Sequence, residues 1–77
     1  MTLQERLRTL RTQKGLSIEK MANELTENGY SITFKTISGY ENAFRQPSVQ
    51  FLTGLTNVYD ANPNWLLTGN GEIFLNK

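Results

Sequence analysis

The apolar residues of this chain recur at intervals of three and four, which is the spacing of one face of an α-helix. Four separate stretches show the pattern. Its members are Leu3, Leu7 and Leu10; Ile18, Met21, Ala22 and Leu25; Phe34, Ile37 and Tyr40; and Leu52, Leu55, Val58 and Tyr59. Strand-like alternation of apolar and polar residues is limited to 71–75 at most. The pattern therefore predicts an all-α fold.

Residues that favour helix ends place the bounds of these helices. A side chain that can accept hydrogen bonds from first-turn amides precedes each helical stretch. These residues are Thr2, Ser17, Thr33, Ser48 and Asn62. Glu5 completes a capping box with Thr2, and Pro63 occupies the first helical position, which proline prefers. We expect five helices, over about 3–13, 18–27, 34–42, 49–59 and 63–68.

The length of the chain sets its domain organisation. A chain of 77 residues forms one domain at most. Gly69 favours the end of the last helix, because glycine adopts the left-handed conformation that follows a helix. We therefore expect a domain over 1–69 and a short C-terminal tail over 70–77.

The composition excludes several kinds of functional site. The chain has no Cys and no His, which excludes disulfides, zinc sites of the usual type and imidazole-dependent catalysis. Its seven carboxylates are scattered, without the spacing of a paired-acid or metal site. We expect no enzyme activity, no metal, no cofactor and no small-molecule ligand. The apolar runs are far shorter than the roughly 20 residues of a membrane span, so we expect a cytoplasmic protein.

Charge is distributed unevenly, although the net charge is only +1. Residues 1–20 contain five Lys or Arg and two Glu, whereas residues 21–42 contain one Lys and three Glu. Such segregation permits a basic face on a nearly neutral domain. An ordinary solvated surface explains the same distribution equally well.

Several segments are specific when they are taken together and in order. They are the basic helix RLRTLRTQKGL, the Ser-capped start SIEKMA, the segment ISGYEN, a Pro-Ser helix start and NWLLTG. Over roughly residues 3–69, they resemble the Cro and phage-repressor family of helix-turn-helix domains, among the xenobiotic-response-element regulators of bacteria and phages. The resemblance implies a compact lambda-repressor-like fold with the helix-turn-helix at the second and third helices. It also implies a transcriptional repressor that binds double-stranded DNA.

The resemblance also implies which residues read DNA bases in the major groove. They are Phe34, Lys35, Ser38 and Gly39. Each has an alternative explanation. Phe34 could pack on the second helix, Lys35 could neutralise a phosphate, and Ser38 could be an ordinary solvated residue. The missing side chain of Gly39 either lets the helix approach DNA closely or reflects drift at an exposed position.

Phosphate contacts are expected from helix starts and flanking loops, where backbone amides and helix dipoles favour anions. The candidates are Ser17, Thr33, Thr36, Asn42 and Arg45. Family members often carry an amide side chain just after the cap of the second helix. Ile18 occupies that position here and cannot form a hydrogen bond. Arg11 and Glu41 match a pair that commonly joins the first and third helices by a salt bridge.

The turn between the second and third helices is longer than the family pattern. Such turns have about three or four residues, and 26–31 contains about five more than the pattern needs. We expect the second helix to continue through Glu27 and to stop at Asn28-Gly29. The surplus should then bulge outward while Ile32 fills the core.

The C-terminal end is the expected dimer surface. One helix-turn-helix reads about one half-site, so the resemblance implies a homodimer, at least on DNA. Candidates for dimer contacts or for packing of the tail on its own domain are Phe44, Trp65, Ile73, Phe74 and Leu75. Two other functions stay open because a fold does not decide function. One is a protein-binding antirepressor or adaptor, and the other is the DNA-binding piece of a longer repressor.

Overall fold

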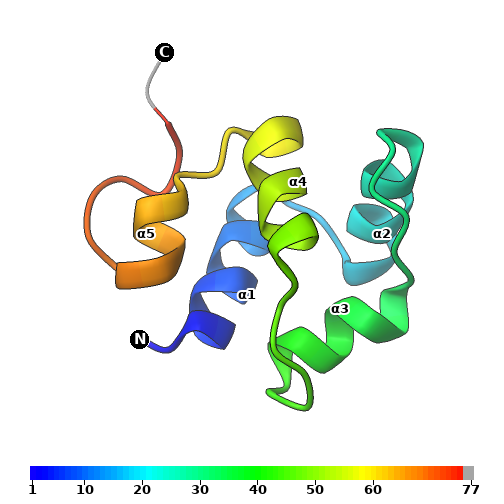
Figure 1. Ribbon diagram of the computed structural model, residues 1–77, viewed down its shortest axis with the longest axis horizontal. Helices are drawn as coiled ribbons and strands as arrows, with labels where there is room; N and C mark the ends of the chain where they lie inside the picture. The colour runs from blue at the N-terminus through cyan, green and yellow to red at the C-terminus, as the bar shows by residue number, and fades with distance from the viewer. Residues whose placement is uncertain (76–77) are drawn as a thin grey trace.

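Five α-helices make up the fold in the computed structural model, which describes residues 1–75. They are α1 (Leu3–Gln13), α2 (Ile18–Glu27), α3 (Phe34–Glu41), α4 (Val49–Tyr59) and α5 (Pro63–Thr68) (Figure 1). The expected all-α class and the order of the helices are confirmed. α3 ends one residue before the predicted bound, because Asn42 is its C-cap.

Local hydrogen bonds explain why the helices begin where they do. All five predicted N-cap side chains accept a hydrogen bond from an amide in the first turn. At α1 the capping box is complete, since the Thr2 amide donates to Glu5 Oε1 at 2.7 Å and the Glu5 amide donates to Thr2 Oγ1 at 3.1 Å. The bond from the Thr2 amide holds the pKa of Glu5 below its usual value.

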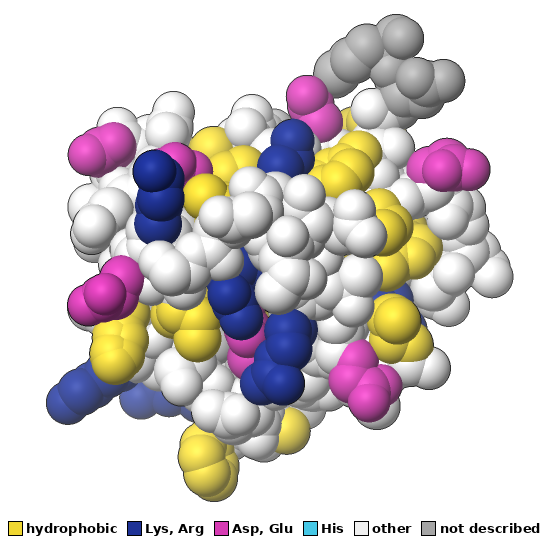
Figure 2. Space-filling view, turned by 180° about the vertical axis from the view of Figure 1, so that it is seen from behind, with side chains coloured by type: hydrophobic (Ala, Val, Ile, Leu, Met, Phe, Trp, Pro, Cys, Tyr) yellow, Lys and Arg dark blue, Asp and Glu magenta, His cyan; other side chains and the backbone are white. Residues whose placement is uncertain are grey.

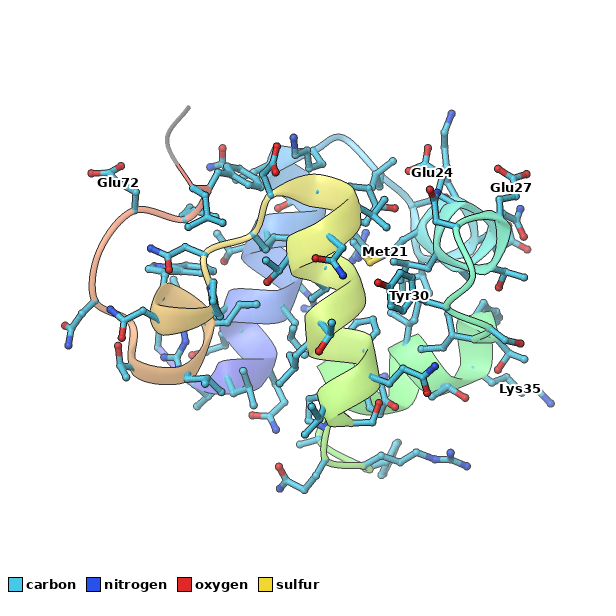
Figure 3. All side chains as sticks on the ribbon, turned by 45° about the horizontal axis from the view of Figure 1, so that its top comes forward. Met21, Glu24, Glu27, Tyr30, Lys35 and Glu72 are labelled. Carbon is cyan, nitrogen blue, oxygen red and sulfur yellow. The ribbon has the colours of Figure 1, made fainter. Side chains whose placement is uncertain are left out.

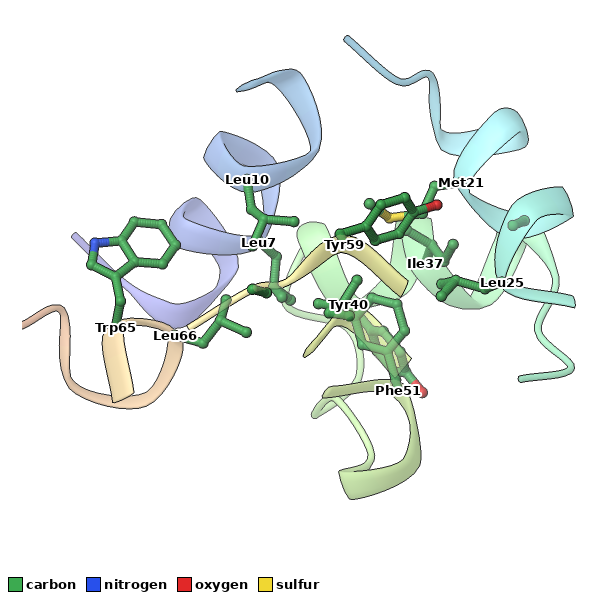
Figure 4. Close-up of a cluster of buried hydrophobic side chains, with 13 residues drawn as sticks. Leu7, Leu10, Met21, Leu25, Ile37, Tyr40, Phe51, Tyr59, Trp65 and Leu66 are labelled. Carbon is green, nitrogen blue, oxygen red and sulfur yellow. The ribbon is translucent and has the colours of Figure 1, made fainter. Parts of the chain in front are cut away.

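The helices enclose one hydrophobic core (Figure 4). α3 packs against α1 and α2, α4 packs against α2 and α5, and α5 packs against α1. The rings of Tyr40 and Phe51 lie 4.8 Å apart between their centroids and join α3 to α4. α3 lies at the lower edge of the view in Figure 1, so one of its sides faces away from the other helices.

Arg6 is buried, which the basic pattern of the first helix did not predict. Its Nε donates to the carbonyl of Leu66 at 2.7 Å, and its Nη2 lies 3.4 Å from the carbonyl of Leu67. Its Nη1 donates to the carbonyl of Met1 at 2.6 Å. Carbonyls in the last turn of a helix lack intrahelical partners. Arg6 therefore satisfies the end of α5 and joins that helix to α1.

The structure confirms one part of the prediction for the turn between α2 and α3 and corrects another. α2 continues through Glu27 and stops at Asn28-Gly29, with Gly29 at φ +92°, as expected. The surplus does not simply bulge outward, because Tyr30 packs against Gly54 of α4 and its hydroxyl accepts from Asn57 Nδ2 at 2.6 Å (Figure 3). The long turn is therefore fastened to α4.

We expect Gly54→Ala to destabilise the fold by about 1 kcal/mol. Overpacking costs about 1–3 kcal/mol, and the higher helix propensity of alanine offsets about 1 kcal/mol of it. A Cβ at Gly54 would lie 2.9 Å from Cγ of Tyr30. Chemical denaturation measures the effect, with Gly54→Ala in a Tyr30→Ala background as the control. That control should lose the penalty, and a stabilised single variant would show that the contact is not tight.

The tail folds back on its own domain. Ala61 and Phe74 form an antiparallel bridge. The Asn62 amide donates to the carbonyl of Ile73 at 2.8 Å, and the Leu75 amide donates to the carbonyl of Asp60 at 2.7 Å. Residues 70–75 are thus attached to the segment between α4 and α5. Residues 76 and 77 of the expected tail lie outside the described residues.

Candidate nucleic-acid interface

The outer side of α3 carries the candidate base-reading residues. An α-helix repeats every 3.6 residues, so residues 34, 35 and 38 share one side of α3, while Ile37 and Tyr40 point toward the core. Phe34 and Lys35 are exposed and Ser38 is half-buried. Lys35 extends away from the helix into solvent (Figure 3). The polar side of α3 is therefore available to a large ligand.

A buried ion pair fixes how α3 lies on α1. Arg11 Nε donates to Glu41 Oε2 at 2.7 Å, and Arg11 Nη2 donates to Glu41 Oε1 at 3.0 Å. The side chain of Glu41 is 2% exposed and that of Arg11 is 13% exposed. The hydrogen bonds to Glu41 raise the pKa of Arg11. Because the guanidinium also donates to the carbonyl of Leu16 at 2.8 Å, the pair is held in a single geometry.

Phe34 packs partly against α2 and is partly exposed to solvent. It lines a shallow crevice with Glu19, Ala22 and Asn23 of α2. The residue nevertheless remains 42% exposed. Packing on α2 and contact with a thymine methyl group are therefore compatible, because different parts of the ring serve each.

Gly39 is buried, so the interpretation that its missing side chain reflects drift at an exposed position is wrong. A Cβ at Gly39 would lie 3.4 Å from Cδ and 3.5 Å from Cγ of Arg45. The side chain of Arg45 thus covers Gly39. Ser38, the neighbouring candidate, accepts a hydrogen bond from Asn42 Nδ2 at 3.2 Å through its Oγ.

The candidate phosphate contacts fall into three places. Ser17 caps α2, where its Oγ accepts from the Lys20 amide at 3.0 Å. Thr33 caps α3, and its Oγ1 lies 3.1 Å from Thr36 Oγ1. A hydroxyl that accepts from an amide still has a hydrogen to donate. The other two candidates lie at or beyond the C-terminal end of α3 and are exposed; they are Asn42 and Arg45.

Most cations of residues 1–20 contact other groups of the domain. Arg6 and Arg11 are largely buried, and exposed Arg8 lies 3.4 Å from the Glu41 carboxylate. The Lys14 ammonium lies 4.6 Å from the ring centroid of Phe74. Figure 2 shows basic and acidic side chains interspersed on the face opposite to that of Figure 1. The cations of residues 1–20 therefore do not form a continuous basic surface on the side shown in Figure 2.

The candidates for dimer or tail contacts differ in how much of each side chain is exposed. Trp65 is 7% exposed and belongs to the core, so it offers little surface to a partner. Ile73 and Phe74 are half-buried and pack against that core. Phe44, in the loop after α3, is 85% exposed, and Leu75 is 39% exposed. These last two present more apolar surface than the other three candidates.

Residues 1–75 contain neither a metal-binding cluster nor a membrane-spanning helix. No group of three or more acidic side chains there is placed to hold a metal ion. Within the same residues, no helix is both long and apolar enough to cross a membrane.

Comparison with known proteins gave one match. A family model described as a helix-turn-helix domain matches residues 3–66. These residues include α1 to α4 and the first turn of α5. Neither the curated proteins nor the solved structures yielded a match.

Proposed function

The chain belongs to the helix-turn-helix domain family, and on that premise we propose that it is a sequence-specific DNA-binding repressor of transcription. α3 is the recognition helix and lies in the major groove. The observation that carries the proposal is the combination of an exposed side of α3, which carries Lys35, with a buried Arg11–Glu41 pair that joins the end of α3 to α1. A helix of fixed orientation is what base reading requires.

The side chains of α3 match the chemistry of base edges. The Lys35 ammonium donates to O6 or N7 of a guanine, the exposed part of Phe34 contacts a thymine methyl group, and the Ser38 hydroxyl bonds to a base of either kind. Lys35 forms no ion pair with a described residue. Its charge is therefore free for DNA.

Phosphates are held at the ends of the helices. The start of α2 and the start of α3 each present free amides and a capping hydroxyl, from Ser17 and from Thr33, toward an anion. Thr36 and Asn42 add neutral donors along α3. Such contacts set the register of the protein on the duplex and carry no sequence information.

The proposed repressor acts as a homodimer in the bacterial cytoplasm, on the nucleoid or on phage DNA. One copy reads about one half-site, and two-fold operators place half-sites about 34 Å apart. Residues 1–69 carry the DNA contacts, and the tail stabilises this unit. Phe44 is the most exposed apolar candidate for the dimer contact.

Selection of bound sequences from a random duplex library tests the proposal. A selected two-fold site, with affinity that falls steeply as salt rises, supports sequence-specific DNA binding by a dimer, because phosphate contacts release counterions. If the library yields no preferred sequence and affinity for duplex DNA does not depend on salt, the proposed function is overturned and the protein-binding alternative is favoured.

We expect Lys35→Ala to reduce affinity for the selected site by about 1–3 kcal/mol and to relax the preference at one base position. A bidentate or charged contact to guanine is lost, while the fold keeps its buried residues. Fluorescence anisotropy with single-base variants of the site measures both effects. Lys14→Ala, which removes an equal charge next to Phe74, is the control. Equal weakening on all sequences would show that Lys35 contacts a phosphate.

A further inference from the structure

Gly39 leaves a gap in the row of side chains on the outer side of α3. The row is formed by Phe34, Lys35 and Ser38, and Gly39 occupies its last position but has no side chain to offer. A glycine inside a helix costs about 1 kcal/mol relative to alanine. The gap is filled, because the stem of Arg45 lies over Gly39.

The backbone of the loop after α3 places Arg45 there. The amides of Phe44 and Arg45 both donate to the carbonyl of Gly39, at 2.9 Å and 3.2 Å. The Ala43 amide donates to the carbonyl of Tyr40 at 3.3 Å, and Ala43 adopts φ +64°. This arrangement is a helix-ending motif with a left-handed residue after the C-cap. The loop therefore folds back along α3 instead of leaving it.

The guanidinium of Arg45 is free while its stem is held. Cγ and Cδ lie 3.5 Å and 3.4 Å from the position of a Cβ on Gly39, and Nε lies at 3.8 Å. The residue is exposed overall. Among residues 1–75, no hydrogen bond or ion pair engages its side chain. A fixed stem with unused donors loses less conformational entropy when it binds.

We propose that Arg45, and not residue 39, reads the base that faces the last position of this row. The inference rests on the proposed DNA-binding function and adds a specificity-determining residue to it. Arginine presents a rigid fork of donors that fits O6 and N7 of guanine, the commonest specific contact in the major groove. The predicted partner is therefore a guanine in each half-site.

The missing side chain of Gly39 leaves space for the side chain of Arg45. A methyl group at residue 39 would only touch the Arg45 stem at van der Waals distance, whereas a long side chain would occupy the same space. The absence of a side chain on the recognition helix thus makes room for one supplied by the following loop.

The test compares base preferences after selection from a random duplex library with the full chain. Arg45→Ala should lose the preference for guanine at one position and bind the selected site roughly 5- to 150-fold more weakly. Arg45→Lys should restore charge without the planar fork and recover only part of the preference. Retention of every wild-type base preference by Arg45→Ala would overturn the inference. So would uniform weakening with a salt slope reduced by about one, which marks a phosphate contact.

Substitutions of Gly39 provide a matched pair. Gly39→Ala should keep the guanine preference, because the Arg45 stem stays in place. Gly39→Met should lose it although Arg45 is still present, and thermal unfolding checks that both variants fold. An unchanged preference in folded Gly39→Met would contradict the inference. A wild-type chain that selects no sequence would overturn the proposed function itself, which separates the two failures.

Discussion

Arg11→Ala is expected to lower the free energy of unfolding by about 3–5 kcal/mol, the cost of leaving a buried charge without its partner. The Glu41 side chain is 2% exposed, so water cannot replace the two hydrogen bonds that Arg11 supplies. Small domains have about 5–15 kcal/mol of stability in total. The variant should therefore be partly unfolded at 37 °C or close to it, as measured by circular dichroism during urea unfolding.

The double-mutant cycle of Arg11 and Glu41 separates the pair from other effects. Glu41→Ala should also destabilise, and the double variant should lose less than the sum, because the shared interaction is removed only once. Arg8→Ala is the control. Its side chain is 60% exposed and 3.4 Å from the carboxylate, so its loss should cost less than about 1 kcal/mol. Strict additivity of Arg11 and Glu41 would contradict a coupled pair.

The bounds of the helices were predictable because they depend on neighbours in the sequence. A capping residue such as Ser17 and the amide it accepts from are three residues apart, so the chain carries the whole signal locally. The apolar spacing likewise identifies residues such as Leu10 and Leu25, which are fully buried. The Arg11–Glu41 pair is different. Its partners are 30 residues apart, and only the family resemblance brought them together.

Contacts between distant segments were not predictable in the same way. Tyr30 contacts Gly54 and Asn57 of α4, and no residue near Tyr30 in the sequence predicts these contacts. One signal was present, because a glycine inside the helical segment FLTGLT indicates a close approach of another group. The position of Gly39 under Arg45 has a similar origin. Helical spacing locates residue 39 on the outer side, but the later loop decides what covers it.

In the first helix, the number of basic residues does not indicate how many of them are exposed. Arg6 and Arg8 look alike in RLRTLR, yet only Arg6 lies three residues from Leu3 and four from Leu10. That spacing places Arg6 within the apolar stripe, so its burial could have been inferred. A cation in such a stripe needs acceptors, and the end of α5 provides them.

Arg6→Ala is therefore expected to destabilise the domain by about 3 kcal/mol. The variant loses two hydrogen bonds from a charged donor, each contributing about 1.5 kcal/mol or more. They join Arg6 to the carbonyls of Leu66 and Met1, at 2.7 Å and 2.6 Å. Arg6→Met keeps most of the packing of the stem and isolates the polar contribution. Arg6→Lys keeps the charge but cannot donate in three directions from a planar group.

Trp65 reports this loss directly, because it is the only tryptophan and lies on α5 with 7% exposure. Without Arg6, the last carbonyls of α5 lose their partners and the helix should separate from α1 before the rest of the domain unfolds. Tryptophan emission should then shift to longer wavelength at lower urea than the circular dichroism signal changes. In the unmodified chain the two transitions should coincide, as in a two-state domain. Coincident transitions in Arg6→Ala, with less than about 1 kcal/mol lost, would show that Arg6 is dispensable for holding α5.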